Sequence, residues 1–142
     1  MSVKVTRTEV WVAEIDDQPG GLAQCLDTLA GAGANLECVI GRRQPNKPGK
    51  GLIFVTPLQG RKMTAAAARA GFRATRRVAT LRLEGADKAG VGAKVARAIG
   101  AAGINLRGVS GATLGRRFVC YLGFDRRADA TKAAAAIRRA RL

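Results

Sequence analysis

Histidine is absent from the 142 residues of the sequence, and aromatic residues make up only 4% of it. Without histidine the chain lacks the side chain that most often acts as an acid or a base near neutral pH. With so few aromatics it offers few surfaces on which single-stranded bases could stack. Both absences argue against familiar function classes: enzymes with a histidine base and readers of single-stranded nucleic acid.

Cysteine is also scarce. Cys25, Cys38 and Cys120 are odd in number and widely spaced. This pattern fits neither a metal site nor a disulfide framework, so we expect no metal and no cofactor. Each cysteine is interpreted as a small buried hydrophobic residue, which is typical of a reducing compartment.

Long apolar runs are missing as well. No stretch approaches the ~18 apolar residues that a membrane-spanning helix needs. The segment from Met1 to Arg7 lacks the apolar core and the small-residue cleavage site of a signal peptide. We therefore expect no membrane association and place the chain in the cytoplasm.

Sequence motifs for catalysis are not found. Ser110 lies in a Gly-Val-Ser-Gly context that lacks the Gly-x-Ser-x-Gly pattern of a nucleophile elbow. The glycine-rich stretch from Gly108 to Gly115 lacks the Gly-Lys-Ser/Thr ending of a phosphate-binding loop. The sequence therefore predicts a protein that is not an enzyme.

Basic residues, in contrast, are abundant. The chain has 25 Lys and Arg against 10 Asp and Glu, a net charge of +15. Residues 1–71 carry a net +3 and residues 72–142 a net +12. Such an excess could bind nucleic acid or an acidic protein partner through charge neutralisation. Because 18 of the 25 are Arg, set among many Ala and Gly, it could equally reflect compositional bias.

An internal repeat organises the chain. The segment Asp17-Gln18-Pro19-Gly20-Gly21 has a counterpart in Asp87-Lys88-Ala89-Gly90-Val91, and Gly33-Ala34-Asn35-Leu36 has one in Gly103-Ile104-Asn105-Leu106. Both matches hold at an offset of 70 residues, with a helix-length stretch between them. Two anchors in one register indicate a duplication.

Each copy contains the same alternation of strand and helix patterns. In the first copy we expect strands at 9–15, 36–41, 52–55 and 72–76, helices at 22–30 and 63–70, and a polar loop or hairpin tip at 42–51. In the second copy we expect strands at 78–83, 106–113 and 118–124, with helices at 91–102 and 128–141. Phe118, Cys120, Leu122 and Phe124 should share one face of their strand.

The order strand-helix-strand-strand-helix-strand predicts an α+β fold. Each copy is expected to form a ferredoxin-like βαββαβ module, an antiparallel sheet with both helices on one face. The expected domains are residues 1–76 and residues 77–142. The second copy ends after its last helix, so its own last strand is expected to be missing.

The junction motifs resemble those of the ACT domain family. The pattern is a strand, then Asp-x-Pro-Gly-x-Leu, then a helix followed by Gly-x-Asn. It is matched in the first copy by Asp17, Pro19, Gly20, Leu22, Gly33 and Asn35, and in the second by Asp87, Gly90, Gly103 and Asn105. In the second copy Ala89 replaces the proline and Gly92 the leucine. The resemblance implies modules that pair side by side, and small ligands, usually amino acids, bound where modules meet.

The chemistry of these residues also favours amino-acid binding. A glycine-rich turn before a helix exposes backbone N–H groups at the positive end of the helix dipole, which suits a carboxylate. The Asn35 amide could bond to both ends of an amino acid, and Asp17 could pair with its amine. Structural roles are the alternative: Asp17 could cap the helix, and Asn35 could occupy a left-handed turn position.

The predicted function is a regulatory, allosteric module. It binds an amino acid and signals through a homodimer interface to a separate effector protein. The less favoured alternatives are a basic interaction module that binds nucleic acid or an acidic protein partner, and a purely structural oligomer. The candidate ligand-binding residues are Asp17, Gln18, Pro19, Gly20, Gly21, Leu22, Asn35 and Leu36 in the first copy, and Asp87, Lys88, Gly90, Val91 and Asn105 in the second. We expect the first copy to hold the better site, because Ala89 gives up the rigidity of the proline and Lys88 changes the charge.

Overall fold

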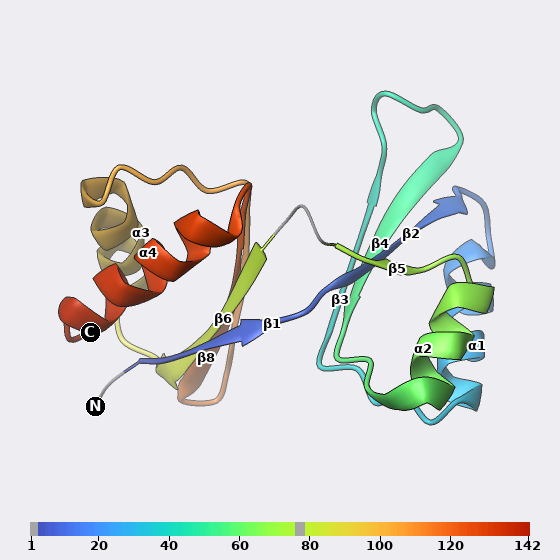
Figure 1. The fold of residues 1–142 in the computed structure, drawn as a ribbon, viewed down its shortest axis with the longest axis horizontal. Helices are drawn as coiled ribbons and strands as arrows, with labels where there is room; N and C mark the ends of the chain where they lie inside the picture. Colours follow the sequence, from blue (N-terminus) through green and yellow to red (C-terminus); the bar gives the residue numbers. More distant parts are fainter. Residues whose placement is uncertain (1–2, 76–78) are drawn as a thin grey trace. The chain divides into compact units, whose positions relative to one another are not determined.

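The computed structural model describes residues 3–75 and 79–142, which form two compact units with separate cores (Figure 1). We call residues 9–75 the central unit. The other unit, which we call the composite unit, combines residues 3–8 with residues 79–142. The chain thus leaves the composite unit after its first strand, builds the central unit, and then returns.

The central unit is a four-stranded antiparallel sheet with two helices on one face (Figure 1). Its elements in chain order are β2 (Trp11–Asp16), α1 (Gly21–Gly31), β3 (Cys38–Arg43), β4 (Lys50–Thr56), α2 (Gly60–Arg69) and β5 (Arg73–Ala74). The strand order is β3-β4-β2-β5, which leaves one side of β3 open at the edge of the sheet.

The composite unit repeats this architecture. Its elements are β6 (Ala79–Ala86), α3 (Val91–Ala101), β7 (Gly108–Leu114), β8 (Arg117–Phe124) and α4 (Arg127–Arg139), together with β1 (Lys4–Thr8) from the start of the chain. The strand order is β1-β6-β8-β7. The predicted α+β class and the ferredoxin-like module are therefore confirmed in both copies.

Strand β1 is the main departure from the sequence-based expectation. The sequence predicts residues 1–8 in the first module and a second module without its last strand. Instead Lys4–Thr8 pairs antiparallel with Thr80–Glu84 and takes the position that β5 holds in the central unit. The physical reason is that an unpaired edge beside β6 would leave backbone groups and core side chains exposed.

The element boundaries mostly agree with the sequence patterns. The strand expected at 36–41 begins at Cys38, and the helix expected at 63–70 begins at Gly60. The strand expected at 72–76 is reduced to Arg73–Ala74, with residue 76 outside the described residues. The first residue of the strand expected at 78–83 also lies outside them.

Each unit has its own apolar core between sheet and helices. Leu29, Val55 and Phe72 are buried in the central unit, and Leu83 and Phe124 in the composite unit. The expected shared face of Phe118, Cys120, Leu122 and Phe124 is confirmed. Cys25 is buried and the other two cysteines are half-buried, and this burial raises the pKa of all three thiols. In the part of the chain that the structure describes, no helix has the length and apolar character to cross a membrane.

Glycines set the start of both helices that follow the repeated turn. Gly20 and Gly90 precede α1 and α3 and have a φ of 85°, a left-handed conformation that glycine adopts without strain. The next position differs between the copies. A Cβ on Gly21 would lie 2.5 Å from the backbone oxygen of Asp16, whereas the equivalent Val91 packs its side chain on the core. The turn of the central unit is therefore the tighter of the two.

The β1–β6 pairing predicts a strong dependence of the composite unit on Val5. Val5 is buried, whereas its neighbour Lys4 is exposed. We expect Val5→Gln to lower the free energy of unfolding by about 2 kcal/mol or more, because it places a polar amide in the core. The matched change Lys4→Gln should cost less than about 0.5 kcal/mol. Hydrogen exchange of the Leu81 and Leu83 amides measures both effects; equal protection in the two variants would contradict the assignment.

The tight turn predicts opposite effects of alanine at the two ends of α1. Gly21→Ala should destabilise the central unit by about 1–3 kcal/mol, because the new methyl group overlaps the Asp16 carbonyl. Gly31→Ala meets no atom within 4 Å, and should be neutral or stabilising by up to about 1 kcal/mol. Urea unfolding followed by the fluorescence of Trp11 compares the two, and a stable Gly21→Ala protein would show that the turn is looser than described.

Candidate functional site

The repeated turn before α1 is open to solvent. Asp17, Gln18, Pro19 and Gly20 are exposed, and Leu22 is exposed to 43%. The Gly21 N–H donates to the Gln18 carbonyl, but the N–H groups of Leu22 and Ala23 have no acceptor among the described residues. These two donors point outward from the positive end of the helix, where they can hold a carboxylate.

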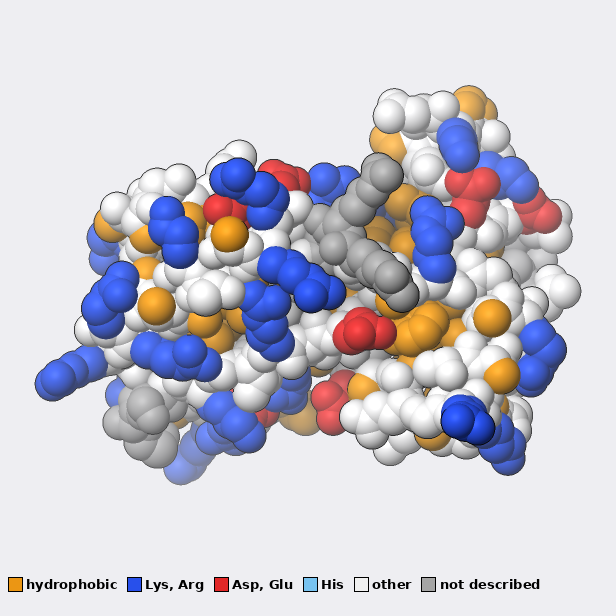
Figure 2. Space-filling view, in the orientation of Figure 1, with side chains coloured by type: hydrophobic (Ala, Val, Ile, Leu, Met, Phe, Trp, Pro, Cys, Tyr) orange, Lys and Arg blue, Asp and Glu red, His pale blue; other side chains and the backbone are white. Residues whose placement is uncertain are grey.

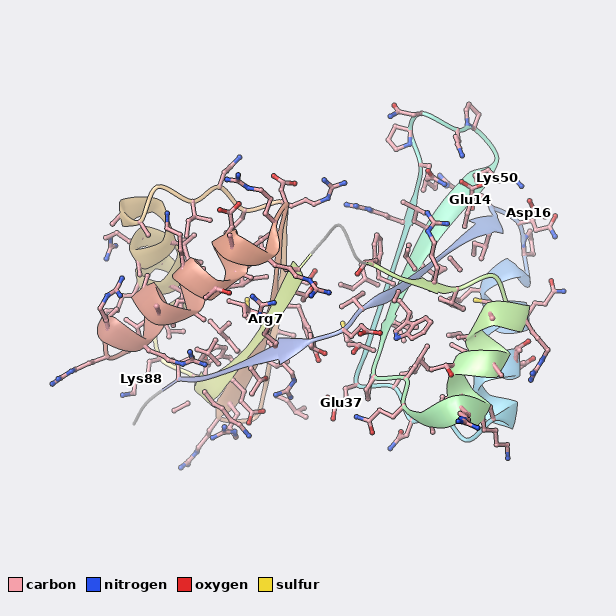
Figure 3. All side chains as sticks on the ribbon, viewed as in Figure 1. Arg7, Glu14, Asp16, Glu37, Lys50 and Lys88 are labelled. Carbon is pink, nitrogen blue, oxygen red and sulfur yellow. The ribbon has the colours of Figure 1, made fainter. Side chains whose placement is uncertain are left out.

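Basic side chains from the β3–β4 hairpin surround this turn. Arg43 contacts Asp17 at 2.8 Å and Lys50 contacts Asp16 at 2.6 Å. Figure 3 shows Glu14, Asp16 and Lys50 together at this end of the unit. Residues 42–51, predicted as a polar loop or hairpin tip, interleave basic residues with proline and glycine, and this composition is the sequence signal for the charged cluster.

Glu14 belongs to the same cluster. Its carboxylate accepts hydrogen bonds from Gln44 at 2.8 Å and from Lys47 at 3.1 Å. These two bonds, with the Gln44 bond contributing most, lower the pKa of Glu14. The bond to Asp16 likewise raises the pKa of Lys50. Through their ion pairs with Lys47 and Lys50, Glu14 and Asp16 connect the end of β2 to the β3–β4 hairpin.

Asp17 does not cap the helix. The residue at the N-cap position is Gly20, and α1 has no side-chain cap. The Asp17 carboxylate instead forms an ion pair with Arg43, in which the two side chains are exposed to 37% and 85%. Exposed pairs of this kind contribute about 0–1 kcal/mol, so another cation can replace Arg43 at little cost.

Asn35 lies at the opposite end of the central unit. It follows the C-terminus of α1, and an 11-residue helix is about 16 Å long. Figure 3 shows Glu37, two residues further on, far from Asp16 and Lys50. The left-handed residue of this turn is Gly33, not Asn35, and the Asn35 amide is exposed without a partner in the described chain. Leu36 packs against the core. Within one central unit, Asp17 and Asn35 therefore cannot hold the same amino acid.

The turn before α3 in the composite unit repeats this layout, but with fewer charged side chains around it. Asp87 and Lys88 are exposed, and neither side chain has a partner among the described residues. Gly90 precedes α3 as Gly20 precedes α1, and Asn105 again lies beyond the far end of the helix. Strand β7 ends at Leu114 and β8 begins at Arg117, so the hairpin between them is short. Among the residues that the structure describes, no cluster of ion pairs covers the turn before α3.

A groove elsewhere in the described residues is less suited to a zwitterion. This shallow groove of about 340 Å³ lies between α3 and α4, lined by five alanines and Arg139, with no acidic group for an amine. Among residues 3–75 and 79–142, no group of three or more potential metal ligands is found. The two helix-start turns and the two asparagines remain the candidate ligand-binding groups.

Comparison with known sequences gives no match to a protein-family model and none to a curated protein. Solved structures, however, are similar over nearly the whole chain. The regulatory subunit of aspartate kinase from Thermus thermophilus has 20% sequence identity and a TM-score of 0.66, covering 99% of this chain and 95% of that one. The corresponding subunit from Thermus flavus has 21% identity and a TM-score of 0.58, covering 99% and 97%.

A third similar structure is protein BT0572 from Bacteroides thetaiotaomicron, with 12% identity and a TM-score of 0.77, covering 92% of this chain and 88% of that one. At these identities the likeness shows the fold. The resemblance to ACT domains drawn from the two turn motifs is thereby confirmed at the level of the fold: this chain has the α+β architecture of the aspartate kinase regulatory subunits, with two modules.

Proposed function

We propose that this chain is a non-catalytic regulatory protein that binds an amino acid at the helix-start turn of its central unit. The observation that carries the proposal is the arrangement at that turn: two unpartnered N–H groups, those of Leu22 and Ala23, beside the Asp17 carboxylate. The full-length likeness to regulatory subunits of aspartate kinase supports it.

The turn offers complementary groups for both ends of an amino acid. The carboxylate of the ligand binds the free N–H groups, where the helix dipole adds to the attraction. The ammonium group binds Asp17 in place of Arg43, a replacement that costs little because that ion pair is exposed. The released Arg43 then provides a second cation near the ligand carboxylate.

Asn35 completes the site only from a second copy of the chain. Strand β3 is an edge strand, and its Val39 is exposed to 43%. If the β3 strands of two copies pair antiparallel about a two-fold axis, the start of one strand lies beside the end of the other. Asn35 precedes the start of β3 and Arg43 is at its end. A homodimer of this kind therefore brings Asn35 of one copy to the Asp17 turn of the other.

The regulatory output follows from this arrangement. A ligand that bridges two copies stabilises the paired form over the separate chains, so its concentration controls the population of the dimer. A separate effector protein in the cytoplasm that binds one of the two forms would receive the signal. The turn of the composite unit, with Lys88 and without the proline, is proposed to bind more weakly.

This proposal predicts stabilisation by one or a few amino acids. In a thermal-denaturation screen of the intact chain against the twenty amino acids, a ligand at 100 times its dissociation constant adds about 2.7 kcal/mol. Asp17→Asn and Asn35→Ala should each abolish the shift. The matched variants Asp87→Asn and Asn105→Ala, at the equivalent positions of the composite unit, should retain it.

Mixing the two inactive variants tests whether the site lies between copies. In an equal mixture of Asp17→Asn and Asn35→Ala chains, heterodimers contain one intact site, so about a quarter of the ligand-binding capacity should return. Recovery of no capacity would show that both residues act within one chain or that neither binds. Absence of a shift with all twenty amino acids would reject the proposal.

A further inference from the structure

Positive charge is concentrated on one of two units with the same fold. By sequence, the composite unit as defined above (residues 3–8 and 79–142) has 15 basic and 4 acidic residues, a net +11, and the central unit has 8 and 6, a net +2. In Figure 2, Lys and Arg side chains cover much of the visible face of the composite unit, on the side where α4 lies. A compositional bias would act on both units, and the shared fold shows that the charge is not required for folding.

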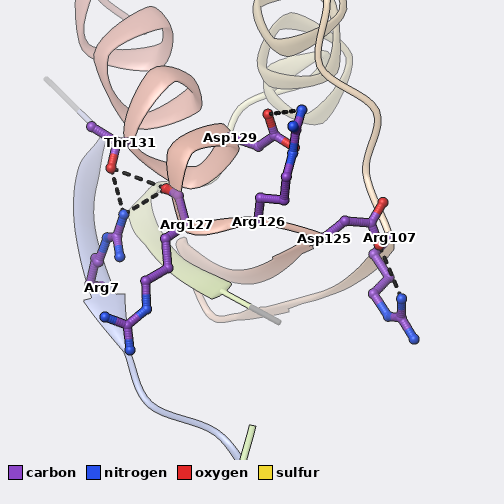
Figure 4. A network of polar contacts seen from close by, with 7 residues as sticks. All are labelled: Arg7, Arg107, Asp125, Arg126, Arg127, Asp129 and Thr131. Carbon is purple, nitrogen blue, oxygen red and sulfur yellow. Dashed lines mark hydrogen bonds and ion pairs between the residues drawn. The ribbon is translucent and has the colours of Figure 1, made fainter. Parts of the chain in front are cut away.

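The acidic residues of the composite unit leave most of this charge unbalanced. Three of the four acids already have basic partners: Glu84 contacts Arg82 at 2.6 Å, Asp125 contacts Arg107 at 3.0 Å, and Asp129 contacts Arg126 at 3.4 Å. Figure 4 shows the last two pairs near the start of α4. There the acceptors of Arg7 among the described residues are neutral, the Arg127 carbonyl and the Thr131 hydroxyl.

The unbalanced cations gather on the outer surface of the two helices, which we call the basic helix face. Its members are exposed and make no ion pair with any described residue: Lys94 and Arg97 on α3, and Lys132 and Arg139 on α4. They lie opposite the core-facing side chains of their helices, such as Ile99 and Ile137. Arg138 and Arg7 flank this face beside β1, where Arg138 donates to the Val5 carbonyl.

This arrangement is electrostatically unfavourable for the chain alone. Arg126 and Arg127 stand at the start of α4, the positive end of its dipole, where cations are disfavoured. Like charges three or four residues apart on a helix also repel each other. A bound polyanion would reverse both effects, because it supplies the counter-charges that the protein lacks.

The side chains between the cations indicate which polyanion fits. The basic helix face contains alanines and no aromatic residue, so it offers neither stacking surfaces for single-stranded bases nor apolar anchors for a membrane. The large exposed hydrophobic residues of the composite unit, Val109 and Leu114, are on β7 instead. Small side chains allow a helix to approach the wide major groove of B-form DNA, whereas the major groove of double-stranded RNA is too narrow.

We propose that the basic helix face binds the phosphate backbone of double-stranded DNA without reading its sequence. Arg and Lys side chains on α3 and α4 contact phosphates, and release of counterions from the DNA provides the free energy. This function is separate from amino-acid binding, because it uses the composite unit and not the central unit. Its test is therefore independent of the amino-acid proposal.

The test is binding of the intact chain to a fluorescent 24-base-pair duplex of arbitrary sequence, measured by anisotropy between 50 and 200 mM salt. We expect affinity to fall roughly 100- to 1,000-fold across this range, since each phosphate contact contributes about 0.9 to the logarithmic salt slope. The variant Lys94→Gln/Arg97→Gln/Lys132→Gln/Arg139→Gln should bind at least about 10-fold more weakly at 100 mM salt, with a slope smaller by about 3.6.

A matched variant of the central unit shows whether DNA binding depends on where the cations lie or only on the total charge of the chain. Arg61→Gln/Lys62→Gln/Arg69→Gln/Arg73→Gln removes the same charge from exposed positions of the unit with a net +2, and should retain binding within about 2-fold. Circular dichroism confirms that both variants are folded. An equal loss in the two variants, no binding to the duplex at 50 mM salt, or tighter binding to polyglutamate, to an RNA duplex or to anionic vesicles would each overturn the proposal.

Discussion

Antiparallel pairing of β1 with β6 is the interaction on which the composite unit depends. Without β1, this unit would have three strands and two helices, and β6 would be an edge strand with no partner on one side. The pairing places Val5 in the core beside Leu83, and Arg7 and Arg138 tie β1 and α4 together through backbone acceptors. Because the five residues of β1 precede the central unit and their partners in β6 come about 75 residues later, the central unit is an insertion within the composite unit.

The helices and strands could be predicted from the sequence, but the repeat did not indicate that β1 pairs with β6 of the other copy. The repeat aligns residues that are 70 positions apart, and the first strand of the chain has no counterpart at that offset. Its alternation of Val3 and Val5 with polar residues is a strand signal, yet alternation does not name the partner strand. Pairing across the whole chain is decided by which edge remains open, which is a property of the folded unit.

The candidate site shows a different limit. The turn motif located the glycines correctly, since Gly20 and Gly90 adopt the same left-handed conformation. The motif did not predict the ion pair between Arg43 and Asp17, because that contact depends on how the β3–β4 hairpin packs beside the turn. The separation of Asp17 from Asn35 could have been predicted from the sequence. The 11-residue helix between them sets a distance that one small ligand cannot bridge.

The ends of the described chain meet in space. The Val3 N–H donates to the Leu142 carbonyl at 3.2 Å, so the end of α4 leads directly into the start of β1. This is the same path that the central unit follows from α2 into β5. A circularly permuted chain that begins at residue 9 and carries residues 3–8 after residue 142 would keep every strand pairing. In that permuted order the nested units become consecutive, and each could be produced and studied as a continuous polypeptide.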